Sequence, residues 1–239
     1  MFNNKKAEMT TQQIVMLIIL LVSFIVIIIF IFFLQPGELT NKEICHNSVV
    51  LQDKSVGFSG GVDCKTSYFC VSGGDNCEEG SQKVKVNEEK KEEIFKAMAD
   101  SMSDCWWMFG EGKIDYTSSK DLECAVCSII SFDKKVQEKY PELSYSEFYN
   151  YLEKTKKTGT ETYLRYLYGV FNVDDLDFSS GFNKTDLNEN INTMEKYSII
   201  TGYDDDWPLI GGGDDIMKVV FINTRETSKT ECDEFITRA

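Results

Sequence analysis

Two cysteines separated by two residues, Cys124 and Cys127, form the most chemically suggestive motif in this chain. Such a pair exchanges electrons when one thiol has a lowered pKa, usually at a helix N-terminus or beside a cation. Here Glu123 precedes the pair and an apolar stretch follows it, and such surroundings raise the pKa of a thiol. A zinc site would need a second closely spaced pair, which the sequence lacks. We therefore favour two structural half-cystines, each bonded elsewhere and one of them to Cys105; a thiol–disulfide oxidoreductase is the alternative.

A cluster of aspartates near the C-terminus is the second candidate for ligand binding. Five carboxylates fall within twelve residues, at Asp204, Asp205, Asp206, Asp214 and Asp215. Carboxylate oxygens in a flexible loop are suitable ligands for calcium. The spacing does not follow the EF-hand pattern, and aspartates beside glycine and proline are also typical of a solvated turn. We therefore favour a solvated turn and expect no cofactor, with calcium bound by these aspartates as the alternative.

Adjacent tryptophans offer a candidate contact for a partner molecule. On a helix, neighbouring residues point about 100° apart, so Trp106 and Trp107 cannot both lie at the centre of one apolar stripe. Trp106 fits the stripe, whereas Trp107 either packs beneath a loop or stays partly exposed. An exposed tryptophan would suit a sugar or protein partner outside the cell.

The motifs of common enzymes are missing from the sequence. The chain contains one histidine, His46, which stands next to a cysteine and near no nucleophile-elbow motif. It has neither a P-loop nor the glycine pattern of a dinucleotide-binding fold. No spacing singles out a pair of carboxylates for glycoside chemistry. We therefore expect a non-enzymatic protein.

The cysteine content predicts disulfide bonds in an exported region. Eight cysteines lie beyond residue 34, an even number that suits an oxidising compartment. Eight cysteines allow 105 complete pairings, so the sequence leaves the connectivity open. The triplet that begins at Asn183 is an acceptor for N-glycosylation and is compatible with export. The disulfide candidates are Cys45, Cys64, Cys70, Cys77, Cys105, Cys124, Cys127 and Cys232.

An apolar run over residues 14–34, interrupted only by Ser23, predicts a transmembrane helix. Lys5 and Lys6 precede the run, and positive residues favour the cytoplasmic side. The run is longer than the core of a signal peptide, and no small-residue cleavage site follows it. We therefore expect a retained signal anchor in the cell membrane, with a cytoplasmic N-terminus and the bulk of the chain outside the cytoplasm.

The segments on either side of the run define the expected domain organisation. Residues 1–13 form a short cytoplasmic tail, 14–34 the anchor in the lipid bilayer, 35–44 a spacer and 45–239 the extracytoplasmic domain. Beyond residue 34 the chain carries 23 basic and 38 acidic residues, a balance of −15. Such a surface repels nucleic acid, so we expect no nucleic-acid partner.

The expected elements of the extracytoplasmic domain indicate an α+β fold. A loop-and-strand subregion at 45–86 precedes a helix-containing body at 87–239. The clearest helix begins after Asn87 and ends at Gly110, because apolar residues recur between them at intervals of three and four. Two further helices are expected after capping-box patterns that begin at Ser144 and Thr158. Strands are expected at 48–51, 67–71, 83–86, 124–132, 196–201 and 217–224.

Two resemblances concern the N-terminus and the chain as a whole. The segment from Lys6 to Gln13, followed by an apolar helix, resembles the class III signal of archaeal pilin-like proteins, although Gln12 stands where that family usually has Glu. That resemblance implies cleavage after Ala7 and a filament subunit. The lysine-rich start, isoleucine-rich anchor and Asp104-Cys-Trp-Trp-Met-Phe-Gly-Glu-Gly segment resemble uncharacterised single-pass proteins of small-genome archaea, which implies no known activity.

These observations together predict a membrane-tethered, disulfide-stabilised α+β module. Its expected role is cell-surface interaction or envelope structure, with an unknown protein or glycan partner. The oxidoreductase and the pilin-like subunit are the alternatives.

Overall fold

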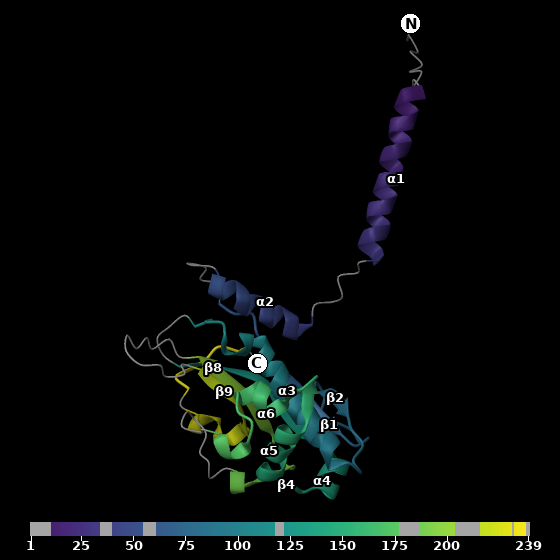
Figure 1. The fold of residues 1–239 in the computed structure, drawn as a ribbon. Helices are drawn as coiled ribbons and strands as arrows, with labels where there is room; N and C mark the ends of the chain where they lie inside the picture. Colours follow the sequence, from purple (N-terminus) through teal and green to yellow (C-terminus); the bar gives the residue numbers. More distant parts are fainter. Residues whose placement is uncertain are drawn as a thin grey trace, which may run out of the picture. The chain divides into compact units, whose positions relative to one another are not determined.

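The computed structural model describes residues 11–33, 40–54, 61–117, 122–176, 187–203, 216–230 and 232–237 (Figure 1). The chain divides into two compact units, residues 1–39 and 40–239. Residues 40–239 form the body.

The described residues of the first unit form one helix, α1 (Thr11–Phe33). Ser23, the one polar residue between Ile14 and Ile28, donates its hydroxyl hydrogen bond to the carbonyl of Ile19 at 2.7 Å. Every side chain described in that stretch is exposed. Among the residues that the structure describes, no helix is both long enough and apolar enough to cross a membrane. The structure thus does not support the expected span over residues 14–34, which stays a prediction.

The body is built on a mixed sheet with the strand order β2-β1-β3-β8-β9. The central strand β3 (Glu123–Phe132) pairs in parallel with β1 (Ser67–Ser72) and antiparallel with β8 (Tyr197–Tyr203). The edge strands are β2 (Gln82–Lys85), parallel to β1, and β9 (Ile216–Asn223), antiparallel to β8. The short C-terminal strand β10 (Glu234–Phe235) pairs in parallel with the first residues of β3. This sheet and its helices confirm the expected mixed α/β character of the domain.

Five helices belong to the body (Figure 1), together with short 3₁₀ turns and two small sheets, as far as the structure describes it. The longest helix, α3, contacts α2, α5 and α6 as well as strands β3, β8 and β9. The helices are α2 (Asn41–Lys54), α3 (Lys91–Met108), α4 (Lys134–Lys139), α5 (Tyr145–Lys154) and α6 (Tyr163–Tyr168). The 3₁₀ turns are Gly110–Gly112, Val173–Asp175 and Thr224–Lys229, and the small sheets pair β4 (Glu142–Ser144) with β7 (Asn190–Asn192) and β5 (Lys156–Thr158) with β6 (Glu161–Thr162).

The apolar stripe predicted for the longest helix forms the centre of the core. All six of its residues are buried in the structure, namely Ile94, Met98, Met102, Cys105, Trp106 and Phe109. The helix ends where the sequence predicted, because Gly110 follows the C-cap with a φ of +76°. This stripe packs α3 against strands β3, β8 and β9, and its burial stabilises the body.

All eight cysteines are joined in four disulfides, and no cysteine is free. Two bonds close short loops early in the body, Cys45–Cys64 and Cys70–Cys77. The other two fasten β3 to α3 and to the C-terminal segment, through Cys105–Cys127 and Cys124–Cys232. The prediction of disulfide bonds is confirmed, and the structure supplies the connectivity that the sequence left open.

The strand expected at 48–51 is wrong, because this segment belongs to the helix α2. The helix begins with a capping box: Thr40 Oγ1 accepts from the Glu43 amide, and a Glu43 carboxylate oxygen accepts from the Thr40 amide. Cys45 and Val49, four residues apart, then lie buried on one face. The capping box reaches into the segment that we expected to be a spacer.

Two helix starts also differ from the prediction. The helix expected after Asn87 begins only at Lys91, because the Asn87 side chain accepts from the Glu89 amide in a local turn. The pattern at Thr158 belongs to the β5–β6 hairpin, whose turn contains Gly159 at a φ of +54°. The following helix α6 is capped instead by Thr162. A capping pattern alone thus did not distinguish a helix start from a hairpin turn.

Candidate functional site

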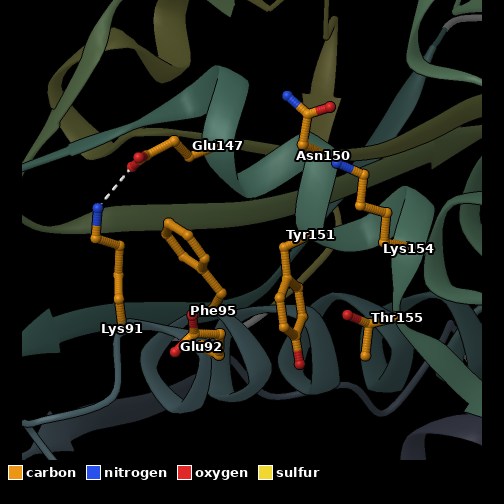
Figure 2. Close-up of a pocket in the computed structure, with 8 residues that line it drawn as sticks. All are labelled: Lys91, Glu92, Phe95, Glu147, Asn150, Tyr151, Lys154 and Thr155. Atoms are coloured by element: carbon orange, nitrogen blue, oxygen red, sulfur yellow. Dashed lines mark hydrogen bonds and ion pairs between the residues drawn. The ribbon is translucent and has the colours of Figure 1, made fainter.

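A cleft of about 420 Å³ lies between α3 and α5 and is lined by residues of these helices and the residue that follows α5. Figure 2 shows Phe95 of α3 and Tyr151 of α5 side by side, extending from opposite walls, with Lys91 and Glu147 at one end and Lys154 at the other. This volume falls within the range of roughly 300–1,000 Å³ that is usual for small-molecule sites. The lining residues are Lys91, Glu92, Phe95, Glu147, Asn150, Tyr151, Lys154 and Thr155.

The spacing of the cleft residues follows from the helices that carry them. In α5, Glu147, Asn150, Tyr151 and Lys154 lie three, four and seven residues apart, which places them on one face. Ser144 is the N-cap of this helix, because its Oγ accepts a hydrogen bond from the Glu147 amide at 3.4 Å. The capping pattern predicted at Ser144 is therefore confirmed. The cap determines where α5 begins and hence which of its residues face the cleft.

Aromatic rings form the centre of the cleft. The Phe95 ring is 5.8 Å from the ring of Tyr151 and 5.5 Å from that of Phe148, measured between centroids. Tyr151 in turn stacks on Tyr163, with 6.3 Å between centroids. Burial raises the pKa of Tyr151 despite a hydrogen bond from Thr155 that acts in the opposite direction. The phenol therefore stays protonated and offers an apolar ring with a neutral hydroxyl.

Charged groups occupy both ends of the cleft. Lys91 Nζ of α3 is 2.8 Å from a carboxylate oxygen of Glu147 of α5, and this ion pair is partly exposed. Such an exposed pair adds little stability, typically about 0–1 kcal/mol. Glu92 and Lys154 make no ion pair within the described part of the chain. The cleft therefore offers one available carboxylate and one available ammonium group around an aromatic centre.

This arrangement is suited to binding a partner molecule. None of the lining residues is a cysteine, serine or histidine that could act as an activated nucleophile. Throughout the described ranges, no three histidine, cysteine, aspartate or glutamate residues come together in a way that could hold a metal ion. An aromatic wall with charges at its ends can instead recognise an amphipathic surface of a partner.

The two cysteines of the CxxC motif are not bonded to each other. Cys127 is bonded to Cys105, as the structural interpretation expected, and Cys124 is bonded to Cys232. All three of Cys105, Cys124 and Cys127 are buried. A redox pair forms its reversible bond between its own two sulfurs, so this arrangement does not resemble an oxidoreductase site.

The adjacent tryptophans occupy different surroundings. Trp106 is buried in the core, and the half-buried Trp107 stacks on His46 of α2 with 4.0 Å between ring centroids. His46 Nδ1 also lies 2.8 Å from the Trp107 carbonyl oxygen, which can only accept, so this nitrogen carries the proton. The expected exposed contact at Trp107 is therefore partly covered by α2.

Two sequence predictions lie outside the described residues. They are the calcium candidates Asp204, Asp205, Asp206, Asp214 and Asp215, and the glycosylation candidate Asn183.

No motif in the sequence indicated the α3–α5 cleft. Its two walls come from residues 91–95 and 147–155, more than fifty positions apart. The only available clue was the amphipathic pattern of each helix, which indicates a buried face and not its partner. A second cavity, lined in part by Tyr116 and Glu123, was also missed.

Comparison of the chain with protein-family models, with curated proteins and with solved structures found no significant match. The body is therefore described by its fold alone, as a mixed α/β domain with four disulfides.

Proposed function

We propose that this protein is a membrane-tethered module whose disulfide-linked body lies outside the cytoplasm and binds a protein or glycan at the cell surface. The observation that carries the proposal is the uncovered apolar surface of α1. The proposed role is recognition or envelope structure without catalysis.

The lipid bilayer is the partner that fits α1. Fourteen large apolar side chains between Ile14 and Ile28 are each exposed by 37–72%. A helix of 23 residues is about 35 Å long, a length comparable to the roughly 30 Å of a hydrocarbon core. Exposure of this much apolar surface to water is unfavourable, whereas lipid chains would cover it. Lys5 and Lys6 support an orientation with the N-terminus in the cytoplasm.

The disulfides support a location of the body outside the cytoplasm. All eight cysteines follow α1, and all are bonded. Structural disulfides persist in oxidising compartments and are rare where thiols are kept reduced. An anchor with a cytoplasmic N-terminus would place the body on the oxidising side.

The α3–α5 cleft is the proposed contact for the protein or glycan partner. Its aromatic centre provides apolar contact area, and Glu92 and Lys154 provide opposite charges without partners of their own in the described structure. Such an arrangement of aromatic rings and polar groups is common to surfaces that recognise other molecules.

Alkaline extraction of membranes from cells that express the full chain tests the anchor. We expect the wild type to stay in the membrane pellet, with its body digested by protease added outside the cytoplasmic membrane. The double variant Leu20→Arg/Ile25→Arg should be lost from the pellet, because central arginines cost roughly 2.5–3.5 kcal/mol each in a membrane helix. The matched control Leu20→Ile/Ile25→Leu should behave as the wild type.

Release of the wild type by alkaline extraction would refute the anchor. The intact mass of the purified chain separates the tethered module from the filament subunit. A mass lacking residues 1–7 would favour the pilin-like alternative, whereas an uncut N-terminus would favour the retained anchor.

A further inference from the structure

A second cavity, of about 340 Å³, lies where the C-terminal segment rejoins the start of β3. Its lining combines two carboxylates, Glu123 and Glu234, with the phenol of Tyr116 and the carbon surfaces of Phe235 and Ile236. Among the described residues that line it, none is a lysine, arginine or histidine. The cavity is thus acidic and partly apolar.

Tyr116 is held in place by its ring and not by its hydroxyl. The side chain is only 4% exposed, and its ring packs 5.0 Å from the ring of Phe109 and 5.9 Å from that of Tyr203. The buried hydroxyl has no hydrogen-bond partner within the described structure. Since buried hydroxyl groups are rarely left without a partner, this hydroxyl lacks a hydrogen bond that a ligand beside it would supply.

Glu123 places negative charge beside this hydroxyl. Its side chain is 2% exposed, in the first residue of β3, and the carboxylate contributes to raising the pKa of Tyr116 after the larger effect of burial. Glu123 has another interaction within the protein. A carboxylate can accept about four hydrogen bonds, so it can accept from a ligand in addition to one partner within the protein.

We propose that this cavity binds an alkylammonium group. The ammonium donates hydrogen bonds to the Glu123 carboxylate and to the Tyr116 oxygen, and the alkyl part lies against Phe235 and Ile236. An aromatic face near a cation adds a further attraction. This site is independent of α1, so the proposal stands whether or not the chain is anchored in a membrane.

The walls of the cavity are fixed by the C-terminal segment. The Cys124–Cys232 bond joins this segment to β3, and the Ile236 amide donates to the Cys124 carbonyl at 2.9 Å. The Val126 amide also donates to Thr237 Oγ1 at 2.9 Å. A site formed in advance by such contacts loses little conformational entropy when a ligand binds.

The lining favours an organic cation over calcium. Calcium takes six to eight oxygen ligands at about 2.3–2.6 Å, whereas Phe235, Ile236 and Val62 supply carbon to this cavity. An alkylammonium group needs only a few acceptors at one end and apolar surface at the other.

Calorimetric titration of the full chain in detergent micelles tests the site, with n-butylammonium as the probe and uncharged n-butanol as its isostere. We expect saturable 1:1 binding of n-butylammonium that is at least tenfold tighter than that of n-butanol. Tyr116→Phe should weaken binding about tenfold while leaving the thermal unfolding midpoint unchanged or raised, because it removes an unpartnered buried hydroxyl. Glu123→Gln should weaken binding further, and the exposed control Glu138→Gln should bind as the wild type.

Four results would overturn the proposal. One is the absence of saturable n-butylammonium binding, and a second is equal binding of n-butanol. The third is a Tyr116→Phe variant that unfolds at lower temperature yet binds normally, since its hydroxyl would then have a structural role. Calcium that binds tightly and displaces n-butylammonium would also refute an organic-cation site.

Discussion

The beginning of the body and the remainder are held together by different means. Residues 40–86 contain two short-range disulfides, and their buried apolar side chains are few: Cys45, Val49, Cys64, Cys70 and Val71. The remaining described part contributes most of the core, including the aromatic group of Phe148, Tyr149, Tyr197 and Phe221. Crosslinks thus replace apolar burial where the chain is rich in glycine, serine and aspartate.

Aromatic packing in the larger region is continuous from helix to sheet. The Phe148 ring of α5 lies 5.9 Å from that of Phe221 in β9, which stacks on Tyr197 of β8 at 4.8 Å. Tyr145 and Tyr168 hydroxyls also donate to β9, at the carbonyls of Phe221 and Val219. These contacts place α5 and α6 along the edge strand β9 and blunt an edge that could pair with another chain.

Phe148→Ala should produce the largest effect, because it removes a fully buried ring from this aromatic group. We expect a loss of about 3–5 kcal/mol in the free energy of unfolding, measured by urea denaturation of the full chain in detergent micelles. The control Phe171→Ala removes a ring that is 64% exposed and should cost much less. Equal losses in the two variants would contradict a core centred on Phe148.

The same division explains which parts of the fold the sequence could predict. The stripe from Ile94 to Phe109 and the apolar strand after Glu123 were predictable, because local periodicity matches their burial. The helix α2 was missed, because its short apolar segment at 48–51 resembles a strand and its position depends on the distant Cys64. Where disulfides hold the chain in place, local apolar periodicity predicts secondary structure poorly.

The candidate site was less predictable than the fold. The capping residue Ser144 was recognised, and it fixes the helix that carries Glu147 and Tyr151. The pairing of that helix with α3, and the closure of the second cavity by Phe235, depend on tertiary contacts between distant segments. One sequence without such contact information cannot specify which helix faces meet.

Cys70→Ala/Cys77→Ala tests the contribution of the disulfides in residues 40–86 and should have an intermediate effect on the free energy of unfolding. The bond closes a loop with a sequence separation of 7, so chain entropy predicts a loss of about 2 kcal/mol in the free energy of unfolding. Cys45→Ala/Cys64→Ala removes a bond with a separation of 19 and should cost about 3 kcal/mol. Urea denaturation measures both, and a larger loss for the shorter loop would show that packing, and not loop closure, stabilises this region.

Asp133→Asn should have the smallest effect, at the polar junction between the two regions. Asp133 Oδ2 accepts from Ser72 Oγ at 2.6 Å and from the Asp75 amide at 2.8 Å, while Oδ1 accepts from the Val136 amide at the start of α4. Burial alone would raise the pKa of this carboxyl, but these hydrogen bonds outweigh it, so the pKa lies below its ordinary value. The ionised carboxylate therefore joins residues 40–86, which contain Ser72 and Asp75, to the start of α4 in the rest of the body.

A lowered pKa in the folded state gives a definite pH dependence. The stabilisation is fully present above the ordinary aspartate pKa of about 3.9 and is lost as the pH falls from there through the lower folded value. Asp133→Asn should cost about 1–2 kcal/mol at pH 7, and the difference from the wild type should shrink below about pH 4. Urea denaturation from pH 7 to pH 3 measures this change. A difference that stays constant over this range would show that the charge of Asp133 does not contribute to joining the two regions.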